Sequence, residues 1–301
     1  MSEIDNVKRV IDFIEENLTE KIKIENLAKV GRASTYHFQR VFSMVCGISL
    51  GEYIRKRRLS EAGKDLKTSK TTVLTLAIKY GYESQEGFSR AFKSYHGVSP
   101  SKARGEVNLK YYQKLSFGCE KRASDRQNYV IKDEDELLLV GYKKRFKGSP
   151  NGVERNEQER EFMTTTRAKQ WLLLGASCDY SKDYFVIDNV DDLGYDFYVA
   201  YEFDESTITD LFNPKITGVK FVGSLGFEVL KIPKERYAIF RTEKKKYPIN
   251  DYQKMRNMIS YEDFLSRGYK IKNAPEIVVL NWRPEGERAK ERYVEIRLPI
   301  E

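Results

Sequence analysis

The sequence predicts two domains of different class: an all-α domain over residues 1–107 and an α+β domain over residues 129–301. Three observations support this prediction. A helical motif repeats at an offset of 50 residues, the pattern changes near Tyr129 from helical stripes to strands with two helices, and positive charge is concentrated before that change. A chain of 301 residues is long enough for two domains that each bury a core.

The all-α domain is organised around the stretch Val73–Arg104, in which a glycine turn joins two helical patterns. The second helix has an apolar stripe at the spacing i, i+3, i+4 and i+7, typical of packing on a core. The stripe consists of Phe88, Ala91, Phe92 and Tyr95. The opposite face is polar and carries Gln85, Glu86, Ser89, Arg90 and Lys93. This arrangement predicts a helix-turn-helix unit.

The same motif occurs earlier, because Ser34–Ser49 aligns with Ser84–Ser99 at a constant offset of 50. The identical pairs are Ser34/Ser84, Phe38/Phe88, Arg40/Arg90, Phe42/Phe92, Gly47/Gly97 and Ser49/Ser99. Tyr36, Gln39, Arg40 and Ser43 lie away from the apolar stripe of the first copy. A helical-bundle repeat with solvated faces is the alternative, but such faces usually mix Lys with Glu. The repeat therefore favours two helix-turn-helix units.

Further helices complete this domain. A first amphipathic helix is predicted by Val7, Val10, Ile11, Ile14 and Leu18. Ile24–Val30 is the short first helix of the first unit, and Ser34 is the expected N-cap of its second helix. The long helix from Leu50 to about Leu66 is expected to brace both units.

Two features of this connecting helix are left open by the sequence. The basic run Arg55–Arg58 suits either a solvated face with salt bridges to Glu52 and Glu61 or contact with phosphates. Gly63 inside the helix costs about 1 kcal/mol relative to Ala, and nothing in its local sequence explains it.

Residues 108–128 are predicted to form a basic linker, and strands alternate with two helices after it. The expected strands are 137–146, 184–187, 195–203, 221–232, 237–242, 276–282 and 292–298, and the expected helices are 154–174 and 248–266. The helix-strand-strand order occurs twice. This repetition predicts a duplicated α+β unit with its helices on one face of a sheet.

Composition limits the classes of function. The formal charge is +8, and by count residues 1–107 carry +6, residues 108–128 carry +3 and the remainder carries −1, which favours a nucleic-acid partner for the first domain. Three widely spaced cysteines without a C-x-x-C pair suit a reducing cytoplasm and argue against a zinc finger. No signal peptide or membrane-spanning stretch is expected.

The first domain resembles the AraC/XylS family of transcription regulators. The family signature is found in Gly81-Tyr82, Ser84-Gln85, Phe88–Lys93, Gly97, Ser99-Pro100 and Arg104, and the match runs from about residue 5 to Arg104. The resemblance implies that two recognition helices enter successive major grooves of double-stranded DNA. It also implies RNA polymerase as a partner and activation rather than repression.

The residues expected to read bases are Tyr36, Gln39, Arg40, Gln85, Ser89 and Arg90. Arginine binds guanine and glutamine binds adenine through two hydrogen bonds each, and the positions of Gln39, Arg40, Gln85 and Arg90 contact DNA in related regulators. Thr35 and Lys93 are expected at phosphates. Glu86 and Gly87 weaken the second helix as a reader, so the first unit is expected to carry more of the specificity.

The second domain resembles, more loosely, the GyrI-like small-molecule-binding domain of Rob-like regulators. The resembling segments are 195–198, 236–240, 264–269 and 295–300, with an apparent insertion near 207–218. The resemblance implies an aromatic-walled pocket between two halves, often with a buried acid. Where the family often has Glu on the penultimate strand, this chain has Val278, so either Glu276 or Glu295 would supply the charge.

The candidate effector-binding residues are Trp171, Tyr198, Phe240, Glu276, Trp282, Tyr293 and Glu295, and each aromatic is equally consistent with an ordinary core. We expect Glu295 to be at least partly buried, with Arg297 on the same strand face as a competing partner. Aromatic faces with a desolvated carboxylate favour cationic or amphipathic effectors. The alternative is a protein-interaction or oligomerisation module without a ligand.

Enzyme chemistry is the least favoured reading. His37 and His96, the two histidines, both fall in the predicted recognition helices, so no histidine-dependent site fits the second domain. Hydrolysis of a bound ligand by carboxylates is left as a minor alternative. No cofactor and no metal are expected.

Overall fold

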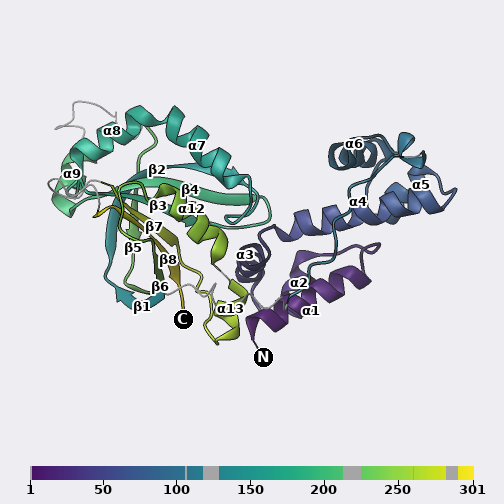
Figure 1. Cartoon of the computed structure of the whole chain (residues 1–301), viewed down its shortest axis with the longest axis horizontal. Helices are drawn as coiled ribbons and strands as arrows, with labels where there is room; N and C mark the ends of the chain where they lie inside the picture. The colour runs from purple at the N-terminus through teal and green to yellow at the C-terminus, as the bar shows by residue number, and fades with distance from the viewer. Residues whose placement is uncertain (1, 106, 118–128, 213–224, 260, 283–290) are drawn as a thin grey trace. The chain divides into compact units, whose positions relative to one another are not determined.

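The structure, a computed structural model, describes residues 2–105, 107–117, 129–212, 225–259, 261–282 and 291–301 (Figure 1). The chain forms two compact units, Met1–Cys119 and Glu120–Glu301. Each unit is described separately below. The first is helical, and the second is built on an antiparallel sheet.

The first unit contains six α-helices and a short 3-10 helix in its described part. They are α1 Glu3–Glu16, α2 Ile24–Val30, α3 Thr35–Cys46, α4 Leu50–Thr68, α5 Val73–Lys79, α6 Gln85–His96 and η1 Lys102–Arg104. The pairs α2–α3 and α5–α6 are the two predicted helix-turn-helix units, and α4 is the predicted connecting helix. The all-α class of this part of the chain is confirmed.

The recognition helices α3 and α6 match residue for residue because both are capped in the same way. The side chain of Ser34 accepts a hydrogen bond from the amide of His37, and that of Ser84 accepts one from the amide of Gly87. Both helices end at a glycine in the left-handed region, with φ of 66° at Gly47 and 85° at Gly97. The predicted N-cap is confirmed, and each helix has twelve residues.

The turns of the two units differ by one residue but share a left-handed position. Gly81 has φ of 77° in the second turn, and Arg32, 49 residues earlier, has φ of 55° in the first. A Cβ atom at Gly81 would lie 2.8 Å from Nη1 of Arg58, but that atom is at the flexible end of its side chain, so the positive φ is the main reason for glycine there. The first turn tolerates arginine at the equivalent position.

The described part of the second unit contains eight strands and several helices. The strands are β1 Tyr129–Glu134, β2 Leu137–Lys147, β3 Lys182–Asp188, β4 Gly194–Glu202, β5 Glu228–Ile232, β6 Glu235–Arg241, β7 Glu276–Asn281 and β8 Tyr293–Pro299. The described helices are α7 Arg155–Thr165, α8 Arg167–Ala176, α9 Glu205–Phe212, α12 Ile249–Met258 and α13 Tyr261–Ser266. Helices and an antiparallel sheet thus occupy one unit, as the α+β class predicts.

Three predicted elements need correction. The helix expected over 154–174 is two helices, because Thr164, Thr165 and Thr166 each bond through the hydroxyl to the carbonyl four residues earlier, which bends a helix. The helix expected over 248–266 is likewise divided into α12 and α13. Of the strand expected over 221–232, the structure shows 228–232, and residues 221–224 lie outside the described part.

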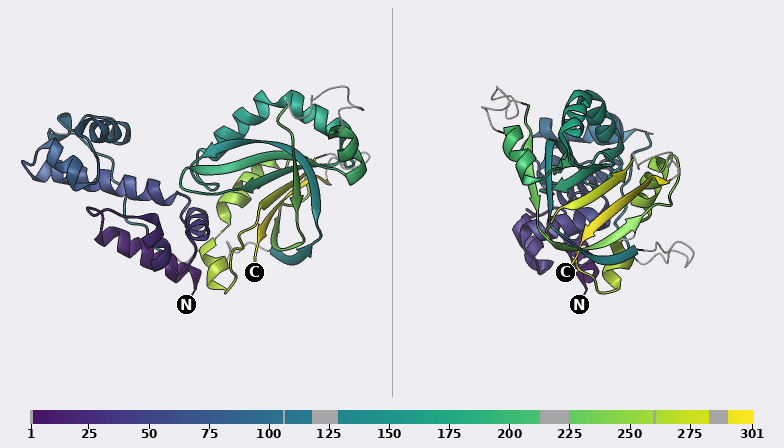
Figure 2. Two further views of the ribbon diagram at one scale, coloured as in Figure 1. Left: turned by 180° about the vertical axis from the view of Figure 1, so that it is seen from behind. Right: turned by 90° about the vertical axis from the view of Figure 1, so that its left-hand side faces the viewer.

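The strand order is β1-β6-β8-β7-β3-β4-β2-β5, and every pairing is antiparallel. This order forces the sheet to curl. Two residues join β1 to β2 and β5 to β6, and such a link spans roughly 11 Å at most. The joined strands are six places apart, which is about 29 Å in a flat sheet. The sheet therefore curls until its two ends approach one another, as Figure 2 shows.

The curl gives the sheet two unlike faces. On the helix-covered face, Tyr142 and Phe146 pack against Phe162 of α7. The other face, called the inner face here, carries a buried apolar cluster that draws on strands from both ends of the sheet. Its members are Leu139, Tyr184, Val186, Tyr198, Ala200, Ile232, Tyr237, Ile239, Ile277 and Val279.

Candidate functional sites

The second recognition helix, α6, presents its predicted polar face as expected. Phe88 and Phe92 are fully buried in the helical core. The residues on the opposite side that are exposed are Gln85, Glu86, Arg90 and Lys93, and Ser89 is half-buried. The helix thus offers an amide, a guanidinium and an ammonium group on one surface. These groups can donate hydrogen bonds to base edges and phosphates.

The first recognition helix, α3, differs at its arginine. Thr35, Tyr36 and Gln39 are partly exposed, but only 1% of the surface of Arg40 is accessible. Within the described residues, Nε and Nη1 of Arg40 have no hydrogen-bond partner. Arg40 and Arg90 occupy equivalent positions in the repeat, yet only Arg90 is accessible to a ligand as the chain stands. Contact between Arg40 and a base requires its guanidinium to become accessible.

The basic run on α4 is largely engaged within the protein. Lys56 lies 2.9 Å from Glu52, and Arg55 lies 3.8 Å from the same carboxylate. Arg58 donates to the carbonyl oxygens of Leu18 and Glu20, at 2.8 and 2.6 Å. These contacts favour the internal-pairing alternative for this run over phosphate contact.

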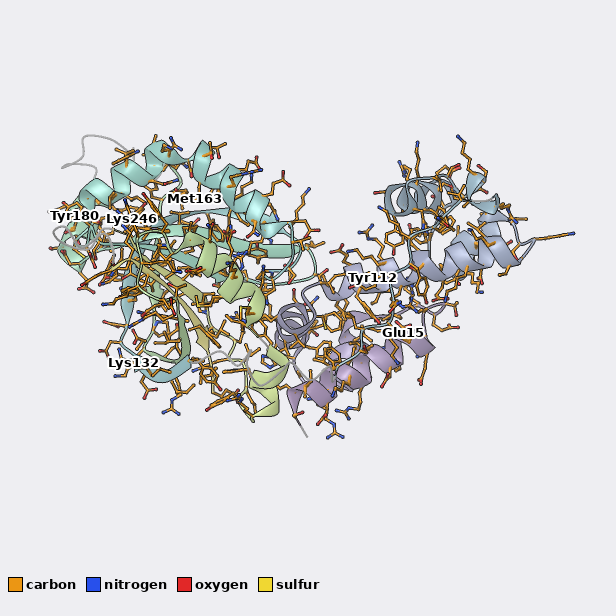
Figure 3. The ribbon with its side chains drawn as sticks, viewed as in Figure 1. Glu15, Tyr112, Lys132, Met163, Tyr180 and Lys246 are labelled. Carbon is orange, nitrogen blue, oxygen red and sulfur yellow. The ribbon has the colours of Figure 1, made fainter. Side chains whose placement is uncertain are left out.

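Arg57 is a framework residue that the sequence did not single out. Its guanidinium binds Glu15 of α1 and Glu61 of α4, and it donates to the carbonyl oxygen of Tyr112 at 2.6 Å. Figure 3 labels Glu15 and Tyr112. The side chain is only 5% exposed. Its location within a run of four cations gave no signal of this role.

The segment 107–117, called the strap here, lies along the first unit, although residues 108–117 were predicted to begin the linker. The amide of Tyr112 donates to Ser60 of α4 at 2.9 Å, and the hydroxyl of Tyr111 donates to Glu61 at 2.9 Å. Lys114 pairs with Asp12 of α1. The strap therefore connects α1 to α4, and the remaining linker residues, 118–128, lie outside the described part.

Gly63 is explained by packing between distant segments. A Cβ atom there would lie 3.1 Å from both the His96 ring and Leu109. The Nε2 atom of His96 is 3.0 Å from the carbonyl oxygen of Leu59, and its ring stacks on Phe92 at a centroid distance of 4.1 Å. Burial lowers the pKa of His96. The glycine thus lets the end of α6 approach α4.

The two candidate acids of the second unit lie on opposite faces of the sheet. Glu276 alternates with Ile277, whose side chain belongs to the inner-face cluster, so Glu276 points to the helix-covered face. Glu295 is the register partner of Val279, another member of that cluster, and therefore lies on the inner face. They cannot serve one common site.

Glu295 is buried, as predicted, and is held by two arginines. Its exposure is 2%. One carboxylate oxygen, Oε1, accepts from Arg241, with Nε at 2.7 Å, and the other, Oε2, accepts from Arg297 at 2.9 Å. Arg297 also pairs with Glu134 at 2.8 Å. Arg297, the competing partner expected from the sequence, therefore pairs with Glu295, and Arg241 is a second partner that was not expected.

Glu276 belongs to a buried polar network, called the helix network here. Arg155 is completely buried and binds Glu159 at 2.5 Å, with Glu276 at 3.7 Å. Arg256 of α12 contacts the same Glu159 at 3.0 Å. Tyr252 completes the network by accepting from Arg155 at 3.2 Å and from Arg256 at 2.9 Å. Two arginines and two glutamates balance one another, so Glu276 already has its counter-charge.

The predicted aromatic residues are also divided among separate places. Tyr198 and Tyr293 share the inner face with Glu295. Phe240 packs on Tyr129 on the helix-covered face, with the two ring centroids 5.1 Å apart. Trp171 on α8 is 69% exposed, and Trp282 follows the end of β7. The inner face therefore gathers Tyr198, Tyr293 and Glu295, and the other four candidates lie elsewhere.

Metal ligands, membrane spans and thiols are considered for the described part of the chain, residues 2–105, 107–117, 129–212, 225–259, 261–282 and 291–301. Within it, no group of three or more His, Cys, Asp or Glu side chains is arranged to hold a metal ion. None of the helices that the structure shows has the length and apolarity required to cross a bilayer. Cys46 and Cys178 are free thiols, and Cys119 lies outside the described residues.

Comparison with known proteins identifies the helical unit. Residues 27–106 match the family model of a helix-turn-helix domain. The chain is 41% identical over 95 residues to the HTH-type transcriptional activator AarP of Providencia stuartii, covering 32% of this chain and 70% of AarP. It is 40% identical over 98 residues to the multiple antibiotic resistance protein MarA of Escherichia coli K12, covering 33% of this chain and 77% of MarA.

Among solved structures, SAV2435 bound to tetraphenylphosphonium is similar over 58% of this chain and 94% of its own, with 16% identity and a TM-score of 0.42. AarP and MarA share about 40% identity with this chain over more than two thirds of their own length. The chain belongs to the AraC/XylS family of helix-turn-helix transcription regulators.

Proposed function

We propose that this regulator is an activator that binds one face of DNA as a monomer, with α3 and α6 in successive major grooves. The observation that carries the proposal is the residue-for-residue match of the two capped helices, α3 and α6, within one chain. A single chain thus supplies the two reading helices that many regulators obtain by dimerisation. RNA polymerase is the expected protein partner of such an activator.

The proposed division of labour follows the chemistry of each side chain. The residues proposed to read base edges are Tyr36, Gln39, Arg40, Gln85, Ser89 and Arg90, and those proposed at phosphates are Thr35 and Lys93. Glu86 is exposed on the same face of α6 and repels phosphate, which restricts how that helix enters the groove. We infer that base reading by α3 depends on Arg40 becoming accessible.

Binding measured against salt concentration tests this proposal. The full chain should bind a DNA site of about two helical turns as a monomer, with an affinity that falls steeply as salt is raised, because several phosphates are neutralised. Titration by fluorescence anisotropy at several salt concentrations, with stoichiometry from analytical ultracentrifugation, provides the measurement. Binding only as a dimer to a palindrome, or independence of salt, would contradict it.

We infer further that the second unit binds an amphipathic or cationic small molecule on the inner face of its curled sheet. The symmetrical strand order supports a duplicated unit, because each half contributes a strand to the edge of the other: β1 pairs with β6, and β5 with β2. Tyr184, Tyr198 and Tyr237 supply buried aromatic rings on this face, and Glu295 supplies a buried carboxylate. Aromatic rings with a desolvated carboxylate suit a cationic or amphipathic ligand.

Two ions of one shape and opposite charge provide the test. The full chain should bind tetraphenylphosphonium more tightly than tetraphenylborate, as measured by calorimetry, and the bound ligand should raise its melting temperature. Failure to bind either ion or a neutral amphiphile would contradict effector sensing.

A protein-interaction role for the second unit is the second candidate. It is favoured by the exposure of Trp171 and Leu172, which are adjacent on α8 and are 69% and 50% accessible. Chemical cross-linking of the full chain with RNA polymerase, compared between wild type and Trp171→Ala, would detect such an interface. Equal cross-linking of both would exclude Trp171 from it.

A further inference from the structure

Arg241 already contacts the two groups on the inner face to which a cationic aromatic ligand would bind, the Glu295 carboxylate and the Tyr293 ring. It stands directly opposite Glu295 in the β6–β8 register and donates to Oε1 of that residue. Its guanidinium carbon also lies 4.7 Å from the centroid of the Tyr293 ring. A buried carboxylate beside an aromatic face is the usual receptor for an organic cation.

The two arginines that pair with Glu295 differ in their exposure and in their other ion pairs. Arg297 is 17% exposed and also pairs with Glu134 at 2.8 Å, so it is held at both ends. Arg241 is 54% exposed, and among the described residues it contacts Glu295 and the Tyr293 ring. Displacing Arg241 costs little packing and returns its charge to water, whereas displacing Arg297 breaks two ion pairs.

We propose that Arg241 is a tethered competitor that sets the charge specificity of the effector site. While it contacts Glu295 and Tyr293, a cationic ligand must compete with Arg241 for the carboxylate and the ring, and a neutral amphiphile does not. A cationic ligand binds by displacing Arg241 from Oε1 and the ring, while Arg297 keeps Oε2 in place and so preserves the orientation of the carboxylate. This proposal rests on the proposed effector-binding function.

The central experiment compares Arg241→Gln with wild type in the full chain, using tetraphenylphosphonium and tetraphenylborate as probes in calorimetry. The variant should bind the cation about tenfold more tightly, because the ligand no longer has to displace a charge-assisted hydrogen bond. Its affinity for the anion should not rise. Arg241→Lys, which keeps the charge, should bind the cation as wild type does.

The strand itself offers a matched control. Arg236 is at the other end of β6, has the same 54% exposure and also pairs with a carboxylate, that of Asp133 at 2.9 Å. Arg236→Gln should leave the affinity for both ions unchanged. The double variant Arg241→Gln/Glu295→Gln should lose the gain, because the freed carboxylate is then absent.

The outcomes separate this inference from the function on which it rests. If wild type binds the cation and Arg241→Gln, folded with a normal melting curve, binds it no better, the competitor role is wrong and effector sensing stands. A gain that survives in the double variant, or that is equal for both ions, also overturns the competitor role, because it would reflect freed space rather than freed charge. If no variant binds either ion or a neutral amphiphile, effector sensing itself is wrong.

Discussion

Arg57 of α4 donates hydrogen bonds to both carboxylate oxygens of Glu15 in α1. Its Nε lies 2.9 Å from Oε1 and 3.0 Å from Oε2, and its Nη2 lies 2.7 Å from Oε2. The same guanidinium reaches the strap through the carbonyl oxygen of Tyr112. One side chain therefore joins the first helix, the connecting helix and the strap. Since α4 connects the two helix-turn-helix units, we infer that Arg57 helps to hold the frame on which both recognition helices depend.

Replacing Arg57 with methionine should destabilise the first unit by about 3 kcal/mol, because it leaves the partly buried Glu15 carboxylate without its cation. Thermal and urea unfolding of the full chain measure the effect. Arg55→Met is the matched control on the same helix, because Arg55 is 47% exposed and lies 3.8 Å from Glu52. It should change stability by less than about 1 kcal/mol. Equal effects of the two changes would remove Arg57 from the frame.

The arginines of the two recognition helices give a prediction about DNA. If each arginine reads a base, Arg40→Ala and Arg90→Ala should each weaken binding to the specific site by about 1–3 kcal/mol and change non-specific binding less. Arg40 is expected to matter more for sequence preference, because Glu86 and Gly87 weaken α6 as a reader. Anisotropy titrations with specific and random duplexes measure both effects.

The burial of Arg40 requires a control for folding. Melting temperatures of both variants show whether a loss of DNA affinity comes from lost contact or from lost structure. Lys93→Ala should weaken binding to specific and random DNA alike, because a phosphate contact carries no sequence information. Equal losses on both duplexes for the arginine variants would reassign those arginines to phosphates as well.

His96 predicts a dependence of stability on pH. Burial lowers its pKa in the folded chain, so the unfolded chain binds more protons between the folded pKa and about 6.5. The contribution of the neutral ring is complete above about pH 6.5 and is lost as the pH falls toward the folded pKa. Lys110 acts in the same direction by repelling the protonated ring.

Unfolding measured from pH 8 to 5 tests this dependence. His96→Gln should flatten the acid side of the profile, because glutamine can still donate to the carbonyl oxygen of Leu59 but does not titrate. His37→Gln is the matched control, since His37 of α3 is partly exposed and pairs with Glu3 of α1 at 2.9 Å. An unchanged acid profile in His96→Gln would show that other groups govern it.

Local signals predicted the elements well because each has a physical cause close to it in sequence. Ser34 caps α3 as expected. The first and last residues of α3 and α6 are each 50 residues apart, as the repeat predicts. The division of the helix at Thr166 escaped prediction, although the three consecutive threonines were its signal. A hydroxyl that bonds back to its own helix is a local effect, so this feature could have been found.

Features that depend on distant partners could not be predicted. The need for glycine at position 63 becomes clear only in the folded chain, where His96 and Leu109 pack against it. Glu276 and Glu295 lie on different strands, and their opposite faces follow from the sheet register, which no single strand reveals. Arg155 and Glu159 have the i, i+4 spacing of an ordinary solvated pair, although the structure buries them both.

Glu159 gives the last prediction, because both buried arginines of the helix network depend on it. It lies 2.5 Å from Arg155 and 3.0 Å from Arg256, and so connects α7 to α12. Glu159→Gln would leave two buried cations facing the single carboxylate of Glu276, and the second unit should lose about 3 kcal/mol of stability.

Glu161→Gln on the same helix is the matched control. Glu161 is 62% exposed and lies 3.4 Å from Lys144, so its replacement should change stability by less than about 1 kcal/mol. Urea unfolding followed through tryptophan fluorescence reports on the second unit, because both tryptophans, Trp171 and Trp282, belong to it. If Glu159→Gln unfolds at the same urea concentration as wild type, the network does not hold α7 and α12 together, and packing of the helices on the sheet must do so instead.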